Sequence, residues 1–152
     1  MERVTIGVIN CNGRDVLPGT LQAIARQTYP VEEVILVDNH STDGSLEWAQ
    51  QAYPHVRCVP QAENRGIAWA RNYLLQAAQT DYLLLMDDDI VLEPDALERL
   101  MDVMRRVPSA AVCHPDIWNR NGSRAWTHYN GGWYHFLAQT ISRPEPTEPR
   151  PD

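Results

Sequence analysis

The segment LLLMDDDIVL places three consecutive aspartates, Asp87, Asp88 and Asp89, inside an otherwise apolar run. Carboxylates this close repel one another, and each raises the pKa of the others unless a cation or a hydrogen-bond donor lies beside them. In an extended segment alternate side chains face the same way, so Asp87 and Asp89 can share one side while Asp88 points elsewhere. The triplet therefore predicts a nearby positive group, with one carboxylate holding a metal ion while another binds a hydroxyl.

The elements that position these aspartates alternate between apolar runs and segments of helical periodicity. The predicted strands are Val4–Ile9, Val34–Val37, Val56–Val59, Tyr82–Met86 and Ala110–Cys113. The predicted helices are Val16–Gln27, Ser45–Tyr53, Ile67–Ala78 and one that begins at Pro94. Strands that read as unbroken apolar runs and alternate with helices are typical of parallel sheets covered on both sides. The sequence therefore predicts an α/β fold, a Rossmann-like and mostly parallel sheet with helices on both faces.

Polar residues follow three of these predicted strands. Asn10 comes after the first strand, Asp38 ends the second, and Asp87 to Asp89 end the fourth. Ligands of open parallel sheets bind beyond the carboxyl ends of the strands, where the connecting loops diverge. A single Asp after a strand is more often a turn former or a helix cap, but three such positions at one edge favour a binding crevice.

The motifs that the sequence lacks narrow the choice of ligand. The turn after the first strand reads NCNGRDVLPG, without GxGxxG, and no GxxxxGK[ST] occurs anywhere. These absences disfavour an NAD site and a P-loop ATP site. An acid that ends a second parallel strand can accept hydrogen bonds from a ribose or a base. Without a glycine-rich cradle, a nucleoside diphosphate needs a hard divalent ion held by one or two carboxylates, which the aspartate triplet offers.

Four segments, in this order, resemble the nucleotide-sugar half of a GT-A glycosyltransferase of family 2. They are VTIGVINCNGRDVLPGTLQAIARQTYP, EVILVDNHSTDGS, ENRGIAWARN and DYLLLMDDDIVLEPDAL, and the resemblance covers about the first 114 residues. It implies that Asp38 recognises the nucleobase and that the loop from Asn10 to Asn12 lies beside the base. It also implies that Asn64, Arg65 and Gly66 border the nucleotide.

At the aspartate triplet the same resemblance implies a DxD motif. Asp88 is then expected near the ribose, and Asp89 together with Asp87 is expected to hold Mn²⁺ or Mg²⁺ at the diphosphate. Asp87 thereby borders the nucleotide sugar as well. The implied activity is the transfer of a sugar from a UDP-, dTDP- or GDP-linked donor to the hydroxyl of a saccharide or another acceptor, with inversion at the anomeric carbon.

The chain departs from the family in its acceptor half. Members of this family normally continue into a second acidic motif, which supplies the general base that deprotonates the acceptor hydroxyl. No acid in the segment HPDIWNRNGSRAWTHYNGGWYHFLAQ matches that motif, so no catalytic base is assigned. The expectation is an acceptor half supplied by a missing C-terminal segment or by a partner chain.

Two other classes of function remain open from the sequence. One is a non-catalytic nucleotide-binding or scaffold domain that keeps the GT-A fold without the acceptor machinery. The other is a receiver-type phosphoacceptor domain, which is less favoured because its acids are expected near the end of the first strand as well, where this chain has Asn10 and Cys11.

Composition limits the domain organisation. A chain of 152 residues with 43% hydrophobic residues suits one compact domain with a core of its own. We expect this domain to span residues 1–141, with residues 115–141 irregular or folded as a hairpin. Residues 142–152, SRPEPTEPRPD, contain four prolines and are predicted to form an extended tail or linker.

Charge and hydropathy exclude some partners. The formal net charge of -7 argues against a protein that binds nucleic acid. No apolar run approaches the roughly 18 residues that a membrane span needs, and the three cysteines show no metal-ligand spacing. The sequence thus predicts a cytoplasmic protein with no membrane span, whose partners are a nucleotide-sugar donor and a hydroxyl acceptor.

Overall fold

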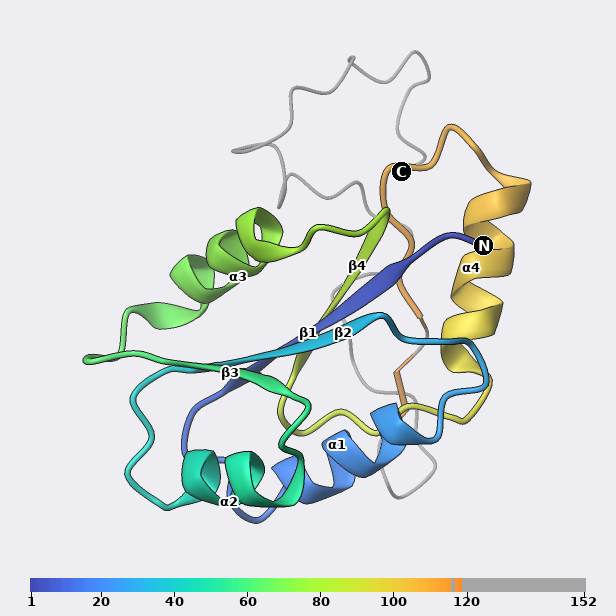
Figure 1. The fold of residues 1–152 in the computed structure, drawn as a ribbon. Coiled ribbons are helices and arrows are strands. Elements are labelled where there is room, and N and C mark those ends of the chain that lie inside the picture. Colours follow the sequence, from blue (N-terminus) through green and yellow to red (C-terminus); the bar gives the residue numbers. More distant parts are fainter. Residues whose placement is uncertain (116, 119–152) are drawn as a thin grey trace. The chain divides into compact units, whose positions relative to one another are not determined.

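The computed structural model describes residues 1–115, 117 and 118, and in this part strands and helices alternate (Figure 1). The strands are β1 (Val4–Asn10), β2 (Glu33–Asp38), β3 (Arg57–Pro60) and β4 (Tyr82–Asp87). The helices are α1 (Leu17–Ala25), α2 (Ser45–Ala52), α3 (Gly66–Ala77) and α4 (Ala96–Arg106). The predicted order of elements is confirmed for these eight.

The four strands form one sheet in the order β3-β2-β1-β4, and every neighbouring pair is parallel. Asn10 lies opposite Asp38 across β1 and β2, and Ile9 lies opposite Asp87 across β1 and β4. The chain adds β2 and β3 on one side of β1 and then crosses to add β4 on the other side. The loops after β1 and β4 therefore diverge at this point, which is where open α/β sheets bind ligands.

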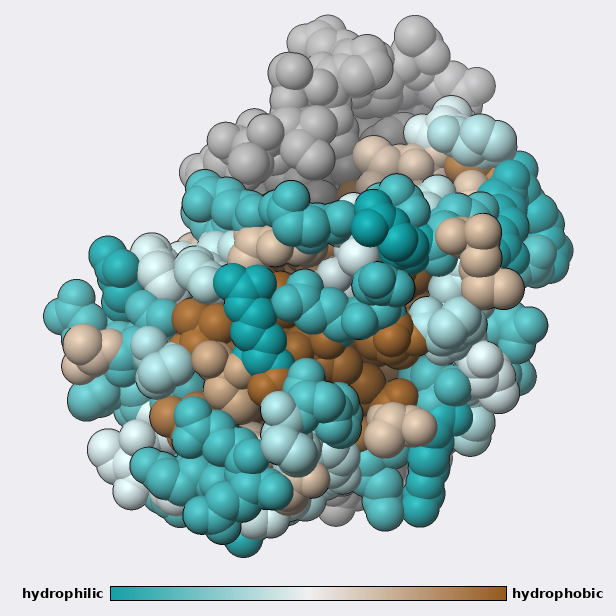
Figure 2. All heavy atoms as spheres, viewed as in Figure 1, coloured by the Kyte–Doolittle hydropathy of each residue, from teal (hydrophilic) through white to brown (hydrophobic). Residues whose placement is uncertain are grey.

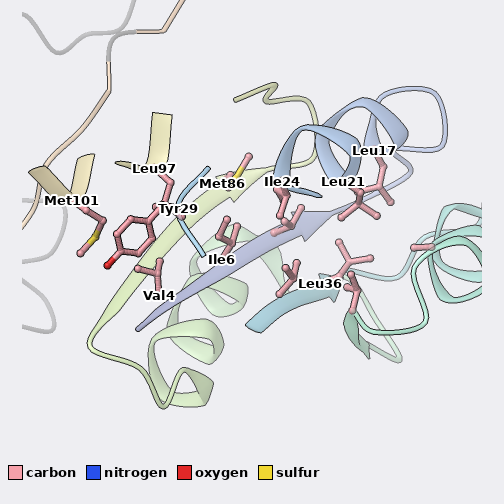
Figure 3. Packing of buried hydrophobic residues seen from close by; sticks show 14 residues of the cluster. Val4, Ile6, Leu17, Leu21, Ile24, Tyr29, Leu36, Met86, Leu97 and Met101 are labelled. Carbon is pink, nitrogen blue, oxygen red and sulfur yellow. The ribbon is translucent and has the colours of Figure 1, made fainter. Parts of the chain in front are cut away.

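Helices cover both faces of the sheet, as predicted. On one face the side chains of β1 and β2 pack with those of α1, α2 and α4 in a single apolar cluster. Figure 3 shows that most of the labelled side chains of this cluster gather around β1. On the other face Ile9, Ile35 and Val37 pack against Ala70 and Leu74 of α3. The alternation of side chains along each strand thus divides one apolar run between two cores.

A close approach holds α3 on its face. A Cβ atom added to Gly7, in the middle of β1, would lie 2.9 Å from both methyl carbons of Leu74. Leu74 itself is fully buried. The absence of a side chain at Gly7 therefore lets this helix pack directly on the strand whose end carries Asn10.

Two sequence predictions are wrong in detail. Ala110–Cys113 is not a strand, because the chain turns after α4, where the Ala110 N–H donates to the Val107 carbonyl at 2.8 Å, and Val112 is left 50% exposed. Two alanines and one valine offer too little apolar surface to hold a strand against the sheet. The fourth helix begins at Ala96, since Pro94 and Asp95 form the turn that precedes it.

Part of the predicted domain organisation lies outside the described residues. The chain divides into two compact units, Met1–His114 and Pro115–Asp152. The expected hairpin within residues 115–141 and the expected tail at residues 142–152 fall almost wholly in the part that is not described. Among the described residues, no helix is long and apolar enough to cross a membrane.

Apolar surface is visible on the face shown in Figure 2, where brown side chains gather over the strands between polar neighbours. A hollow of about 420 Å³ opens at the amino ends of β2 and β3. It is lined by residues of α1, of the start of β2 and of the loops that precede β2 and β3, among them Ile24, Val34 and Val56. This hollow and the polar carboxyl ends of the strands lie at opposite ends of the sheet.

Candidate functional site

A second hollow lies at the carboxyl ends of the strands, and we call it the strand-end pocket. Its volume of about 390 Å³ falls within the roughly 300–1,000 Å³ of typical small-molecule sites. It is lined by side chains from β1, β4, the start of α3 and the loops between them, namely Ile9, Cys11, Asn39, Asn64, Gly66, Ile67, Asp87 and Asp88. The pocket thus lies where the chain crosses from one side of β1 to the other.

The three aspartates occupy different environments. Asp87, the last residue of β4, lines the pocket and pairs with Arg71 of α3, whose guanidinium nitrogen lies 3.6 Å from its Oδ1. Asp88 also lines the pocket, and its Oδ2 accepts a hydrogen bond of 3.1 Å from the backbone N–H of Cys11. Asp89 is exposed and is not among the lining residues. The guanidinium of Arg71 therefore offsets part of the charge of the triplet.

Electrostatic crowding remains at Asp88. Burial raises the pKa of this carboxyl above its usual range, and the neighbouring charges of Asp89 and Asp87 raise the pKa further. The hydrogen bond from the Cys11 N–H opposes this rise. A cation beside the triplet would stabilise the ionised form, as expected from the sequence.

Asn10 and Asp38 form a buried polar network next to the pocket. The Asn10 amide is fully buried, and its Nδ2 donates to Asp38 Oδ1 at 2.6 Å. The same nitrogen lies 2.9 Å from the hydroxyl oxygens of Ser41 and Ser45. Asp38 is 2% exposed, and its Oδ2 accepts from the Ser41 N–H at 3.0 Å. Both oxygens of Asp38 thus hold neighbouring parts of the protein together.

An amide pair closes another wall of the pocket. Asn39 is 4% exposed, its Nδ2 donates to Asn64 Oδ1 at 2.9 Å, and its own Oδ1 accepts from the Arg65 N–H at 2.9 Å. Asn64 Oδ1 also accepts from the Gly66 N–H, and Asn64 Nδ2 lies 3.5 Å from Cys11 Sγ. These contacts join the end of β2 to the start of α3, where Gly66 has a φ of +79° that suits glycine.

The loops after β1 and β2 also hold each other. The Asn12 N–H donates to Ser41 Oγ at 2.9 Å, and the Thr42 N–H donates to Asn12 Oδ1 at 2.8 Å. Asn12 has a φ of +55° and His40 one of +67°, and an asparagine side chain tolerates this left-handed region better than most. The side-chain oxygen of Asn12 therefore has a structural partner in the neighbouring loop.

The structure brings some of the predicted residues to the pocket and leaves others outside its lining. Asn64, Gly66, Asp87 and Asp88 line the pocket. Residues outside its lining are Asn10, Asn12, Asp38, Arg65 and Asp89. Arg65 is exposed, and its guanidinium lies over the Trp69 ring at 4.5 Å from the centroid. The roles predicted for these nine residues stay predictions.

Sequence reasoning gave no role to Asn39 and Ile67, which line the pocket. A signal for Asn39 was available, because it directly follows Asp38 at the end of a predicted strand. Ile67 is 46% exposed in the first turn of α3, and its neighbours in the sequence do not distinguish it from an isoleucine of the core.

The donor set suits a hard divalent cation that is shared with a ligand. Within residues 1–115, 117 and 118, no three His, Cys, Asp or Glu side chains converge as a complete metal cage. Mg²⁺ and similar ions are commonly held by only one or two carboxylates plus phosphate oxygens. The neighbouring carboxylates of the triplet are enough to supply the one or two protein ligands that such an ion needs.

Comparisons with known proteins agree with this architecture. A model described as glycosyl transferase family 2 matches residues 5–150. The chain is 35% identical over 96 residues to the putative teichuronic acid biosynthesis glycosyltransferase TuaG of Bacillus subtilis, a match that covers 61% of this chain and 38% of that protein.

Two solved structures show the same fold. The mannosyltransferase PcManGT from Pyrobaculum calidifontis, in complex with GDP-Man and Mn²⁺, matches 68% of this chain and 32% of its own, with a TM-score of 0.61 and 29% identity. TarS of S. aureus, in complex with UDP, matches 79% of this chain and 43% of its own, with a TM-score of 0.63 and 19% identity. This chain spans less than half the length of each of these three relatives. It belongs to glycosyltransferase family 2 and has the GT-A fold.

Proposed function

We propose that the strand-end pocket binds the nucleoside diphosphate of a nucleotide sugar, and that the chain serves the transfer of that sugar to an acceptor hydroxyl. The observation that carries this proposal is the pocket itself. It lies at the carboxyl ends of β1 and β4, and it combines two carboxylates with an amide pair and three less polar side chains. Nucleotides need such a mixture, because a base, a ribose and phosphates present different chemistry.

The base is assigned to the side of the pocket formed by Cys11, Asn39, Asn64 and Ile67. Cys11 and Ile67 offer apolar surface for a ring face, and the amides of Asn39 and Asn64 can both donate and accept hydrogen bonds at a base edge. A direct contact between Asp38 and the base remains part of the proposal. It requires Asp38 to exchange one of its hydrogen bonds to Asn10 or Ser41 for one to the base.

The ribose and the metal-bound diphosphate are assigned to the aspartates. Asp88 is proposed to bind the ribose through the carboxylate oxygen that does not accept from Cys11. Asp89 together with Asp87 is proposed to hold Mn²⁺ or Mg²⁺. When bound, such an ion stabilises the negative charge that develops on the departing diphosphate. Arg71 restrains Asp87 from the α3 side.

Relatives support this assignment of ligands. The PcManGT structure contains GDP-Man and Mn²⁺, and TarS structures contain UDP or UDP-GlcNAc. A UDP-, dTDP- or GDP-linked sugar is therefore the proposed donor. The binding site for the acceptor hydroxyl and the general base that deprotonates it are proposed to belong to a segment or partner outside the described residues.

Calorimetric titration of the chain with UDP, dTDP and GDP, each with and without Mn²⁺, tests the proposal. The expected result is saturable binding of at least one nucleotide, tightened by Mn²⁺. Binding of none of the three under either condition would contradict it. Release of the nucleoside diphosphate from the matching nucleotide sugar, measured on the same sample, separates an enzyme from a non-catalytic nucleotide-binding domain.

A further inference from the structure

Gly13, in the loop after β1, is buried at the meeting point of two strand ends. A Cβ atom built on Gly13 would overlap Asp88 Oδ2 and lie 2.6 Å from Asn10 Oδ1. The φ of Gly13 lies outside the left-handed region, since only Gly44 and Gly66 among the described glycines have positive φ. An alanine at this position is therefore disfavoured by steric clashes and not by backbone conformation.

One of the two neighbours is held more firmly than the other. The Asn10 amide is fully buried, and its Nδ2 is tied to Asp38, Ser41 and Ser45. The Asp88 carboxyl is the end of a flexible side chain beside the open pocket. Any side chain at Gly13 would therefore displace the Asp88 carboxyl.

The displaced carboxyl has a specific task in this loop. Asp88 Oδ2, the same oxygen that a Cβ on Gly13 would meet, accepts the hydrogen bond from the Cys11 N–H. Cys11 lines the pocket next to Asn64. The Asp88 main chain is held separately, because its carbonyl accepts from Thr20 Oγ1 of α1 at 2.6 Å. Movement of the carboxyl alone would thus release Cys11 while leaving β4 in place.

We propose that Gly13 is a positioning residue of the strand-end pocket, because its missing side chain leaves Asp88 the space to hold Cys11 in the pocket lining. The effect on the loop follows from these contacts alone. The effect on nucleotide affinity rests in addition on the proposed function. Gly13 thereby sets the distance between the loop after β1 and the aspartates after β4.

Amide hydrogen exchange in the full 152-residue chain tests the effect on the loop. Gly13→Ala is expected to accelerate exchange of the Cys11 amide by about tenfold or more, because the amide loses its acceptor. Gly19→Ala is the matched control, since a Cβ there would meet only Val91 Cγ2 at an ordinary 3.7 Å. Cys11 exchange that is unchanged in Gly13→Ala would overturn the proposal.

A double variant separates this collision from general destabilisation. Asp88→Ala alone is expected to accelerate Cys11 exchange, because it removes the acceptor oxygen. Adding Gly13→Ala to Asp88→Ala is then expected to cause little further change in Cys11 exchange, because the acceptor of the Cys11 N–H is already gone. If Gly13→Ala unfolds the chain, Asp88→Ala alone still tests the contact, and unchanged Cys11 exchange in that variant would overturn the proposal. An equal effect of Gly13→Ala in both backgrounds would show that it does not act through Asp88 and would overturn the proposal.

Nucleotide affinity distinguishes a failure of this inference from a failure of the proposed function. If the wild-type chain binds a nucleotide, Gly13→Ala is expected to weaken that binding by about tenfold or more, as for other residues that orient a ligand group. Gly19→Ala is expected to bind like wild type. Faster Cys11 exchange with unchanged affinity would overturn the role of Gly13 in the pocket. If the wild-type chain binds no nucleotide, the proposed function fails, while the exchange rates still decide whether Gly13 positions the loop.

Discussion

Asp89→Asn is expected to abolish the effect of Mn²⁺ on nucleotide affinity while the chain stays folded. In the wild-type chain Mn²⁺ is expected to tighten nucleotide binding by about tenfold or more, because a hard divalent ion bridges carboxylate and phosphate oxygens. The amide that replaces Asp89 carries no charge and binds such ions weakly. Calorimetric titration with and without Mn²⁺ measures the difference directly.

The fold should tolerate this change, because Asp89 is exposed and its charge is one cause of the raised pKa of Asp88. Removing that charge relieves repulsion within the triplet. Asp102→Asn on α4 is the matched control, since the partner that Asp102 has among the described residues is Arg106 on the same helix, and such pairs contribute little. Retention of the full Mn²⁺ effect in Asp89→Asn would refute the metal assignment.

The second large effect is expected from Asn10→Ala, which should lower the free energy of unfolding by about 2–3 kcal/mol. Asn10 is fully buried, and its amide nitrogen supplies a hydrogen bond to the carboxylate of Asp38, which is itself 2% exposed. The substitution leaves that buried carboxylate with one donor fewer. A loss of this size is a substantial part of the roughly 5–15 kcal/mol that stabilises a typical domain.

Urea denaturation measures this loss, and Asn72→Ala provides the control. Asn72 lies exposed on α3, so the same replacement there is expected to change stability by no more than about 0.5 kcal/mol. Equal stabilities of the Asn10→Ala and Asn72→Ala chains would show that the buried network contributes nothing. Nucleotide affinity should also fall in Asn10→Ala, because the loop from Asp38 to Ser45 loses its anchor on β1.

The fold was predictable because the pattern of apolar residues along the chain agrees with the way the strands and helices pack in the structure. Val4–Ile9 and Val34–Val37 are mostly apolar and carry no charge, as expected of strands covered on both faces, and the structure divides their apolar side chains between two cores. The placement of Asn10, Asp38 and Asp87 at one edge followed from parallel pairing alone. The prediction of a strand at Ala110–Cys113 failed because a short apolar run does not reveal whether a neighbouring strand is available for pairing.

The interior of the site was less predictable, because it depends on contacts between distant residues. Asn39 and Asn64 are 25 positions apart, and their pairing arises from the approach of α3 to the end of β2. The alternation rule separated Asp88 from Asp87 and Asp89, but the structure places Asp87 and Asp88 together in the pocket lining. The turn that follows β4 ends the regular alternation there. The requirement for a glycine at position 13 became visible only with Asp88 and Asn10 in place.

The central claim is that a metal-bound nucleotide occupies the strand-end pocket, and paramagnetic line broadening tests it most directly. Backbone amide signals of the nucleotide-bound chain are followed by NMR while Mn²⁺ is added, with Mg²⁺ as the diamagnetic control. The signals of Cys11, Asn39 and Asp88, which line this pocket, are expected to broaden first. Those of Val34 and Val56, beside the hollow at the opposite edge, should persist. Early broadening around Val34 and Val56, with sharp signals from Cys11 and Asp88, would contradict the account.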